Sequence, residues 1–225
     1  MVKSLKIKKG TMPPPKTYNY TTNDVVMSSG NKKVFLDFRD PSGKFVPSFR
    51  ENNICYCSYS MKKLAEAKQR SSPENRAFKG SELHFKGFQD FAEWITKEKF
   101  YGFPDYELDK DLFYDGGILR YSKETCCLIP KVLNSNLKEE HTDNLIGATF
   151  DKLRNKFVCK VGVSLLGSNH RLFFGRFDTA EECHEVYIRE KTKLIRNEIA
   201  ESFKDHVDGR VYEQLKQWVP KIHRI

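Results

Sequence analysis

The chain contains 225 residues, of which 39% are hydrophobic and 13% aromatic, and its net charge is +9. This composition is typical of a globular protein and excludes a disordered chain. No apolar run approaches the ~20 residues that a membrane span needs, and no apolar segment follows the basic residues 1–9, so we expect no membrane partner and no signal peptide. The six cysteines form no CxxC pair, which favours free thiols in a reducing compartment and no zinc site.

The positive charge is concentrated in two segments. Residues 1–33 contain seven Lys and one Asp, and residues 145–177 contain six basic residues and one Asp. Residues 34–144 carry 17 basic and 18 acidic residues, and residues 178–225 carry nine basic and ten acidic residues. Clustered cations are an electrostatic signature of phosphate binding, and a cluster inside a folded segment is a stronger indication than one in a tail.

The first elements along the chain are an arm, a hairpin and a helix. Residues 1–33 combine lysines with a Pro-Pro-Pro run and predict an irregular basic arm. The turn sequence Asp-Pro-Ser-Gly at 40–43 separates the runs 34–38 and 44–46, which predicts a β-hairpin. The apolar spacing within residues 56–70 predicts a helix.

An aromatic stripe follows at helical spacing. Its members stand at i, i+3, i+6 and i+7 and are Phe88, Phe91, Trp94 and Ile95. Such a stripe is compatible with base stacking, but the spacing is more typical of the core face of a helix, which is our interpretation. Short elements are expected over residues 105–137, with a helix beginning near Pro130.

The C-terminal third has the clearest pattern. After a polar linker at 138–146, strands are predicted at 147–151, 156–163 and 170–177. A capping-box sequence at 179–182 then begins a predicted helix.

Side chains of the middle strand alternate between two faces. One face is apolar and comprises Phe157, Cys159, Val161 and Val163. Lys156 and Lys160 lie on the other face, because successive side chains of a strand point in opposite directions. We therefore expect a three-stranded antiparallel sheet that packs its apolar face on the helix and leaves a basic face uncovered.

The C-terminal pattern resembles AP2 DNA-binding domains over about 45 residues. The hallmark is the run from Phe174 to Tyr187, and residues 147–150 and 156–161 resemble the first two strands of that family. In AP2 domains the three-stranded sheet lies in the DNA major groove and the helix backs it. The resemblance therefore implies double-stranded DNA as the partner and agrees with the basic face that strand alternation predicts.

A β-ribbon fits the major groove, and Lys and Arg on it neutralise phosphates and release counterions. The candidate DNA-binding residues are Arg154, Lys156, Lys160, Arg171 and Arg176. Simple alternation places Arg176 with Leu172 and Phe174, on the opposite side from Arg171.

The preceding region resembles phage HNH-endonuclease-like proteins that carry an AP2 module. The matching segments are residues 88–94, 108–111 and 121–130, followed by Asn134. The HNH fold is a ββα-metal unit in which an Asp and a His or Asn hold one divalent ion and a neighbouring His activates water. The metal steadies the phosphate and the leaving oxygen, and the His gives general-base help.

Carried over by residue, Asp109 and Asn134 match the metal ligands, so the resemblance implies Mg²⁺ or another divalent cation. Lys110 stands in the position of the general-base His, and Thr125 in that of the central Asn. An unperturbed lysine has a pKa near ~10.4 and is protonated at neutral pH, which makes it a poor base. The catalytic positions Asp109, Lys110 and Asn134 thus form a degenerate motif.

We expect an α+β protein in which a degenerate ββα-metal (HNH-like) region precedes an AP2-like three-stranded antiparallel sheet packed on a helix. The predicted domains are a basic arm (1–33), the HNH-like region with its N-terminal hairpin (34–137), a linker (138–146), the AP2-like module (147–203) and a helical tail (204–225).

The favoured function is that of a phage HNH/AP2 endonuclease-like DNA-binding protein with weak or lost nuclease activity, in the cytoplasm of the infected bacterial cell. One alternative is an active metal-dependent homing-type endonuclease. Another is an inactive nuclease fold that serves as an adaptor for phage or host proteins during host takeover or protein trafficking, which the near-neutral charge of residues 34–144 favours mildly.

Overall fold

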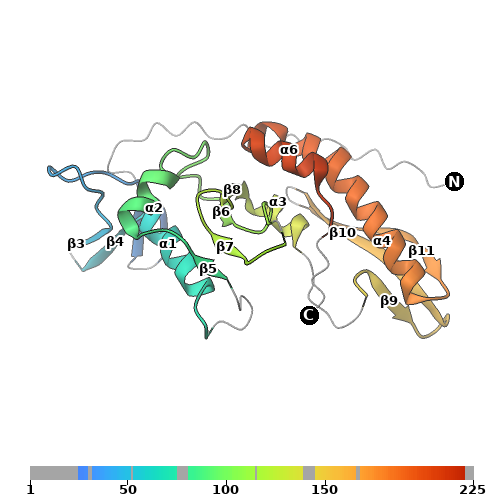
Figure 1. Cartoon of the computed structure of the whole chain (residues 1–225). Coiled ribbons are helices and arrows are strands. Elements are labelled where there is room, and N and C mark those ends of the chain that lie inside the picture. Colours follow the sequence, from blue (N-terminus) through green and yellow to red (C-terminus); the bar gives the residue numbers. More distant parts are fainter. Residues whose placement is uncertain are drawn as a thin grey trace. The chain divides into compact units, whose positions relative to one another are not determined.

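A computed structural model shows a mixed α+β protein with several small sheets (Figure 1). The residues that the structure describes are 25–29, 32–51, 53–74, 81–114, 116–138, 145–165 and 168–220. These residues divide into two compact units, one ending at Pro130 and the other beginning at Lys131. No helix within the described ranges is long and apolar enough to span a membrane.

The first unit contains a four-stranded sheet of order β1-β2-β4-β3. The strands are β1 (Val25–Ser29), β2 (Lys32–Phe35), β3 (Ser48–Glu51) and β4 (Ile54–Ser58). β1 and β2 occupy part of the predicted irregular arm, so that prediction is wrong for residues 25–29 and 32–33, while residues 1–24, 30 and 31 lie outside the described ranges.

The predicted hairpin over residues 34–46 is only partly present. Its turn forms, since Gly43 N–H donates to the Asp40 carbonyl at 2.8 Å and the Asp40 carboxylate accepts the backbone N–H groups of Ser42 and Lys44. The flanking runs pair only at an isolated bridge between Arg39 and Phe45. The reason is that β2 has antiparallel β1 on one edge and parallel β4 on the other, which uses both of its hydrogen-bonding edges.

Two helices and two pairs of short strands complete this unit. The helices are α1 (Tyr59–Arg70) and α2 (Phe88–Ile95). β5 (Glu82–Leu83) pairs in parallel with β7 (Arg120–Tyr121), and β6 (Tyr106–Asp109) pairs antiparallel with β8 (Cys127–Pro130). Ser58 caps α1 by accepting the Met61 N–H at 3.1 Å, so the helix begins three residues after the start of the predicted segment.

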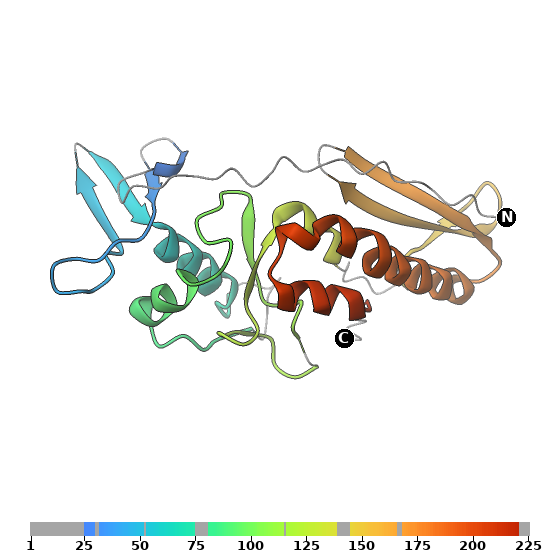
Figure 2. The same ribbon diagram turned by 90° about the horizontal axis from the view of Figure 1, so that it is seen from above.

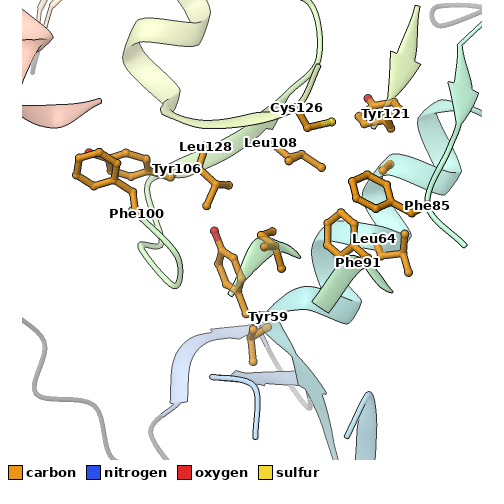
Figure 3. Packing of buried hydrophobic residues seen from close by; sticks show 13 residues of the cluster. Tyr59, Leu64, Phe85, Phe91, Phe100, Tyr106, Leu108, Tyr121, Cys126 and Leu128 are labelled. Carbon is orange, nitrogen blue, oxygen red and sulfur yellow. The ribbon is translucent and has the colours of Figure 1, made fainter. Parts of the chain in front are cut away.

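The core of the first unit joins α1, α2 and the β6–β8 pair (Figure 3). Phe91 is fully buried, and its ring centroid lies 4.8 Å from that of Phe85. The interpretation of the aromatic stripe as a core face is confirmed, because Phe91 and Ile95 are buried and Phe88 and Trp94 pack against the same cluster.

A buried lysine attaches α1 to β6. The Lys63 ammonium donates to the Tyr106 carbonyl at 2.7 Å and lies 3.8 Å from Glu66. Burial lowers the pKa of Lys63 to about 8, against the raising effect of Glu66. This contact fixes the start of the strand that ends at Asp109.

The second unit begins with α3 (Lys131–Leu137) and contains a three-stranded antiparallel sheet of order β11-β10-β9. The strands are β9 (Ala148–Asp151), β10 (Lys156–Leu165) and β11 (Ser168–Phe177), close to the predicted ranges. The helix α4 (Ala180–Leu194) packs against all three strands and runs along the sheet in both views (Figures 1 and 2).

Local signals account for the start of α4. Thr179 accepts the Glu182 N–H at 3.2 Å, and the Glu182 carboxylate accepts the Thr179 N–H at 3.4 Å, so the predicted capping box is confirmed. The strand β9 approaches the same helix closely, because the Cα of Gly147 faces the side chain of Tyr187.

The chain continues beyond α4 as a further helical region. It comprises a π-helical segment η2 (Ile195–Ile199), α5 (Ala200–Phe203), a 3₁₀ turn η3 (Lys204–His206) and α6 (Gly209–Gln217). Val211, Leu215 and Trp218 are buried, which confirms the predicted final short helix. Arg196 donates to the carbonyl of Trp218 at 2.7 Å and holds this end of the chain.

The helix α3 belongs with the sheet that follows it rather than with the strands before it. The Asn136 side chain donates to the Ser164 carbonyl at 2.8 Å and accepts the Ser164 N–H at 2.7 Å. The Asn136 side chain thus satisfies both backbone groups of Ser164 near the end of β10, as a paired strand would do. The boundary between the units therefore falls at Pro130, seven residues before the predicted end of the HNH-like region at 137.

Candidate functional site

The register of β10 with its neighbours divides the sheet into two faces. Cys159, Val161 and Val163 are almost fully buried, and β10 packs against α4. Lys160, the intervening residue, is exposed. Because residues directly opposite in an antiparallel pair share a face, the partners of Val158, Lys160 and Gly162 lie on the side away from α4. We call this side the outer face.

A β-bulge in β11 determines which residues join the outer face. Cys159 pairs with Gly175 and Lys160 pairs with Phe173, which leaves Phe174 as an extra residue. One extra residue reverses the alternation, so Arg176, opposite Val158, lies on the outer face with Phe173 and Arg171. The expectation that Arg176 shares a side with Leu172 is therefore wrong.

The outer face and the turn at its end bring all five predicted DNA-binding residues together in one unit. Lys160 and Arg171 are exposed, and within the described ranges neither has an acidic side chain at ion-pair distance. Phosphate oxygens therefore do not need to displace a carboxylate from either of them.

The other three cations are held by two acids. Arg154 and Arg176 lie 3.2 and 3.6 Å from the Asp151 carboxylate, and Lys156 forms an ion pair with Asp178. Burial acts to raise the pKa of Asp151, but the hydrogen bond and charge of Arg154 outweigh it and lower that pKa. The pairs hold these exposed side chains in place and leave an excess of positive charge on the face.

An exposed aromatic ring lies among these cations. Phe173 is 51% exposed, and the Arg176 guanidinium carbon lies 5.1 Å from its ring centroid. The sequence did not single out Phe173 as a candidate site residue. The available signal was its position two residues after Arg171, which places both side chains on the same face of the strand.

The second candidate site is the loop that follows β6. Asp109 is 6% exposed, and its Oδ1 accepts the N–H groups of Asp111 and Leu112 at 3.0 and 2.8 Å. Burial, and after it the charge of Asp111, raise the pKa of Asp109 to about 6, against the lowering effect of the backbone amides and of Lys110. The carboxylate is therefore already engaged by its own loop.

Lys110 is buried as well, at 3% exposure. Its Nζ donates to the Asp111 carboxylate at 2.5 Å and lies 5.5 Å from the centroid of the Tyr121 ring. An ammonium paired with a carboxylate donates protons in its hydrogen bonds and offers no lone pair to a water. An ammonium in this pair cannot act as a general base.

The remaining residues of the predicted nuclease motif have different surroundings. Thr125 donates to the Arg120 carbonyl at 2.5 Å and accepts the Ser122 N–H at 3.2 Å, so it closes the loop between β7 and β8. Asn134 is buried in α3 and belongs to the other unit.

The groups that act on Asp109 are the backbone amides of Asp111 and Leu112, the Asp111 carboxylate and the Lys110 ammonium, and a fixed cation opposes the binding of another. Throughout the described part of the chain, no three His, Cys, Asp or Glu side chains are grouped so that they could hold a metal ion.

Comparison with known proteins adds no relative: no family model, no curated protein and no solved structure matches this chain.

Proposed function

We propose that the protein binds double-stranded DNA in the major groove through the outer face of β9–β11, in the manner of AP2 domains. The observation that carries the proposal is the division of this sheet, since α4 covers one face while Lys160 and Arg171 are exposed on the other without acidic partners among the described residues. A β-ribbon fits the major groove, and α4 packs on the face opposite to these two cations.

The residues of the outer face suit different parts of a duplex. Lys160 offers a point charge to a phosphate, and the planar guanidinium of Arg171 can donate two hydrogen bonds to a phosphate or to the O6 and N7 of guanine. Phe173 offers an apolar contact to a thymine methyl group, and Arg176 is positioned beside it. The proposal therefore includes phosphate contacts from β10 and β11 and base contacts from β11.

The test is duplex binding by the full chain, measured by fluorescence anisotropy over a range of salt concentrations. We expect the affinity to fall steeply with salt, and Arg171→Glu to weaken binding about tenfold or more because it replaces attraction to phosphate by repulsion. Arg189→Glu is the matched control, since Arg189 is an exposed arginine on α4, which packs on the opposite face. Absence of binding at low salt, or equal effects of the two variants, would contradict the proposal and favour the adaptor hypothesis.

We further propose that the β6–β8–α3 segment is a degenerate HNH-like region in which cleavage is weak or lost. Along the chain, an antiparallel strand pair is followed directly by a helix, which is the order of a ββα unit, while the packing of α3 with the second unit supports the loss of the metal site. The burial of Lys110 and its ion pair with Asp111 support the loss of a general base.

A further inference from the structure

The first unit has a polar pocket of about 280 Å³ beside β7, outside the Asp109 loop. Four of its seven lining residues carry or can accept a positive charge, namely His84, Lys86, Arg120 and Lys123. They come from three places in the sequence, around β5, β7 and the start of α2. Cations thus converge here in a region whose total charge is near zero.

The two acids of the pocket are already engaged. Asp90 accepts the Lys123 ammonium at 2.5 Å and the Lys86 backbone N–H at 3.1 Å, and the Lys123 hydrogen bond is the main cause of its lowered pKa. Hydrogen bonding from Ser122 is the main reason that the pKa of Glu124 is lowered. Lys86 and Arg120 remain without an acidic partner among the described side chains.

Arg120 has an unmet hydrogen-bonding requirement at this pocket. Its Nε is buried, and within the described ranges no hydrogen-bond acceptor contacts that atom. A buried donor without an acceptor is costly, and the structure usually satisfies it through a water or a ligand. Arg120 also lines the pocket, and the two terminal nitrogens of a guanidinium match the spacing of two oxygens on a phosphate.

We propose that this pocket binds a phosphate group, with Arg120 as its principal donor and Lys86 as a second cation. His84, whose Nε2 lies 2.6 Å from Glu82, and Ser122 complete the polar lining of the same space. The phosphate belongs either to a free phosphate or phosphomonoester, or to the backbone of the DNA that the protein is proposed to bind.

Inorganic phosphate is the probe for the first experiment, in which the full ¹⁵N-labelled chain is titrated against sodium chloride of matched ionic strength. We expect saturable shifts of the amide signals of residues 84–86 and 122–124 in the wild type. Arg120→Gln should weaken phosphate binding about tenfold or more, because a charge-assisted hydrogen bond is lost. Lys86→Ala removes an exposed side chain without disturbing the interior and should also weaken binding, whereas Lys97→Ala, another exposed lysine of this unit, should not.

Duplex binding by the same variants identifies the source of the phosphate. A loss of DNA affinity in Arg120→Gln but not in Lys97→Ala assigns the pocket to the DNA backbone. Unchanged DNA affinity with lost phosphate binding assigns it to a free phosphate or phosphomonoester. The proposal is overturned if the wild type shows no saturable shift, or if both pocket variants bind phosphate as well as the wild type does. Because inorganic phosphate binding needs no DNA, this outcome is separate from the fate of the proposed function.

Discussion

At the scale of single residues, burial changes the pKa of Asp109, which the sequence alone does not reveal. Its pKa is raised to about 6, because it is buried and stands near Asp111. The charged form is therefore less favourable in the folded protein than in the unfolded chain, where the ordinary value is 3.8. The contribution of Asp109 to the free energy of unfolding is therefore fully present below about pH 4, where its carboxyl group is protonated in both states. This contribution is lost as the pH rises through 6.

Asp109→Asn should therefore stabilise the protein at neutral pH. An amide oxygen can still accept the N–H groups of Asp111 and Leu112, while the penalty for a buried charge disappears. We expect a gain of about 2 kcal/mol at pH 7 that vanishes below about pH 4, measured by urea unfolding over this pH range. Asp105→Asn is the control, because Asp105 is exposed. Lower stability of Asp109→Asn at pH 7 would mean that the ionised carboxylate is favourable in the folded state.

At the scale of secondary structure elements, the contact between the start of β9 and α4 depends on a glycine. Gly147 has a φ of +83°, and a Cβ atom there would lie 2.2 Å from Cγ of Tyr187. Gly147→Ala should lower the free energy of unfolding by about 2 kcal/mol or more, because it combines backbone strain with a steric clash. Gly209→Ala is the matched control, since Gly209 lies in α6 with open space around it and should be neutral or slightly stabilising. Equal melting temperatures for the two variants would contradict the close packing of β9 on α4.

Elements with strong local signals could be predicted from the sequence, and those that depend on distant partners could not. The strands β9 to β11 and the capping box of α4 follow from alternation and from Thr179 and Glu182. The bulge at Phe174 depends on how β11 pairs with β10, so simple alternation placed Arg176 on the wrong face. In the same way, the turn at 40–43 was predictable, but the pairing of β2 with the distant β4 was not.

The candidate site was predictable to a similar extent. Lys156, Lys160 and Arg171 could be chosen from strand alternation, because they lie in the regular parts of β10 and β11. The ion pairs that engage Arg154, Lys156 and Arg176 could not, since they depend on how the strands and the following turn bring two acids near. The pocket around Arg120 has no sequence signature, because parallel pairing of the very short strands β5 and β7 creates it.

At the scale of the whole molecule, the residues proposed to bind DNA lie in a different unit from Asp109 and Lys110 of the predicted nuclease motif. The basic segment 145–177, with six basic residues and one Asp, lies in the second unit. Asp109 and Lys110 lie in the first unit. A chain of this kind can bind a duplex through one unit even if the motif in the other has no activity. Binding and cleavage therefore need separate assays on the intact protein.

We expect the full chain to leave supercoiled plasmid intact, or nearly so, with Mg²⁺ or Mn²⁺ at concentrations where duplex DNA is bound. The physical reason is that Lys110 is buried and donates to Asp111, so the position of the general base holds no group that can take a proton from water. Conversion to nicked circles would be followed on agarose gels, with EDTA and the variants Asp109→Asn and Asp105→Asn in parallel. Metal-dependent nicking that Asp109→Asn abolishes and Asp105→Asn retains would contradict this expectation and favour an active endonuclease. An intact plasmid together with salt-sensitive binding would instead identify the second unit as the one through which the protein acts on DNA.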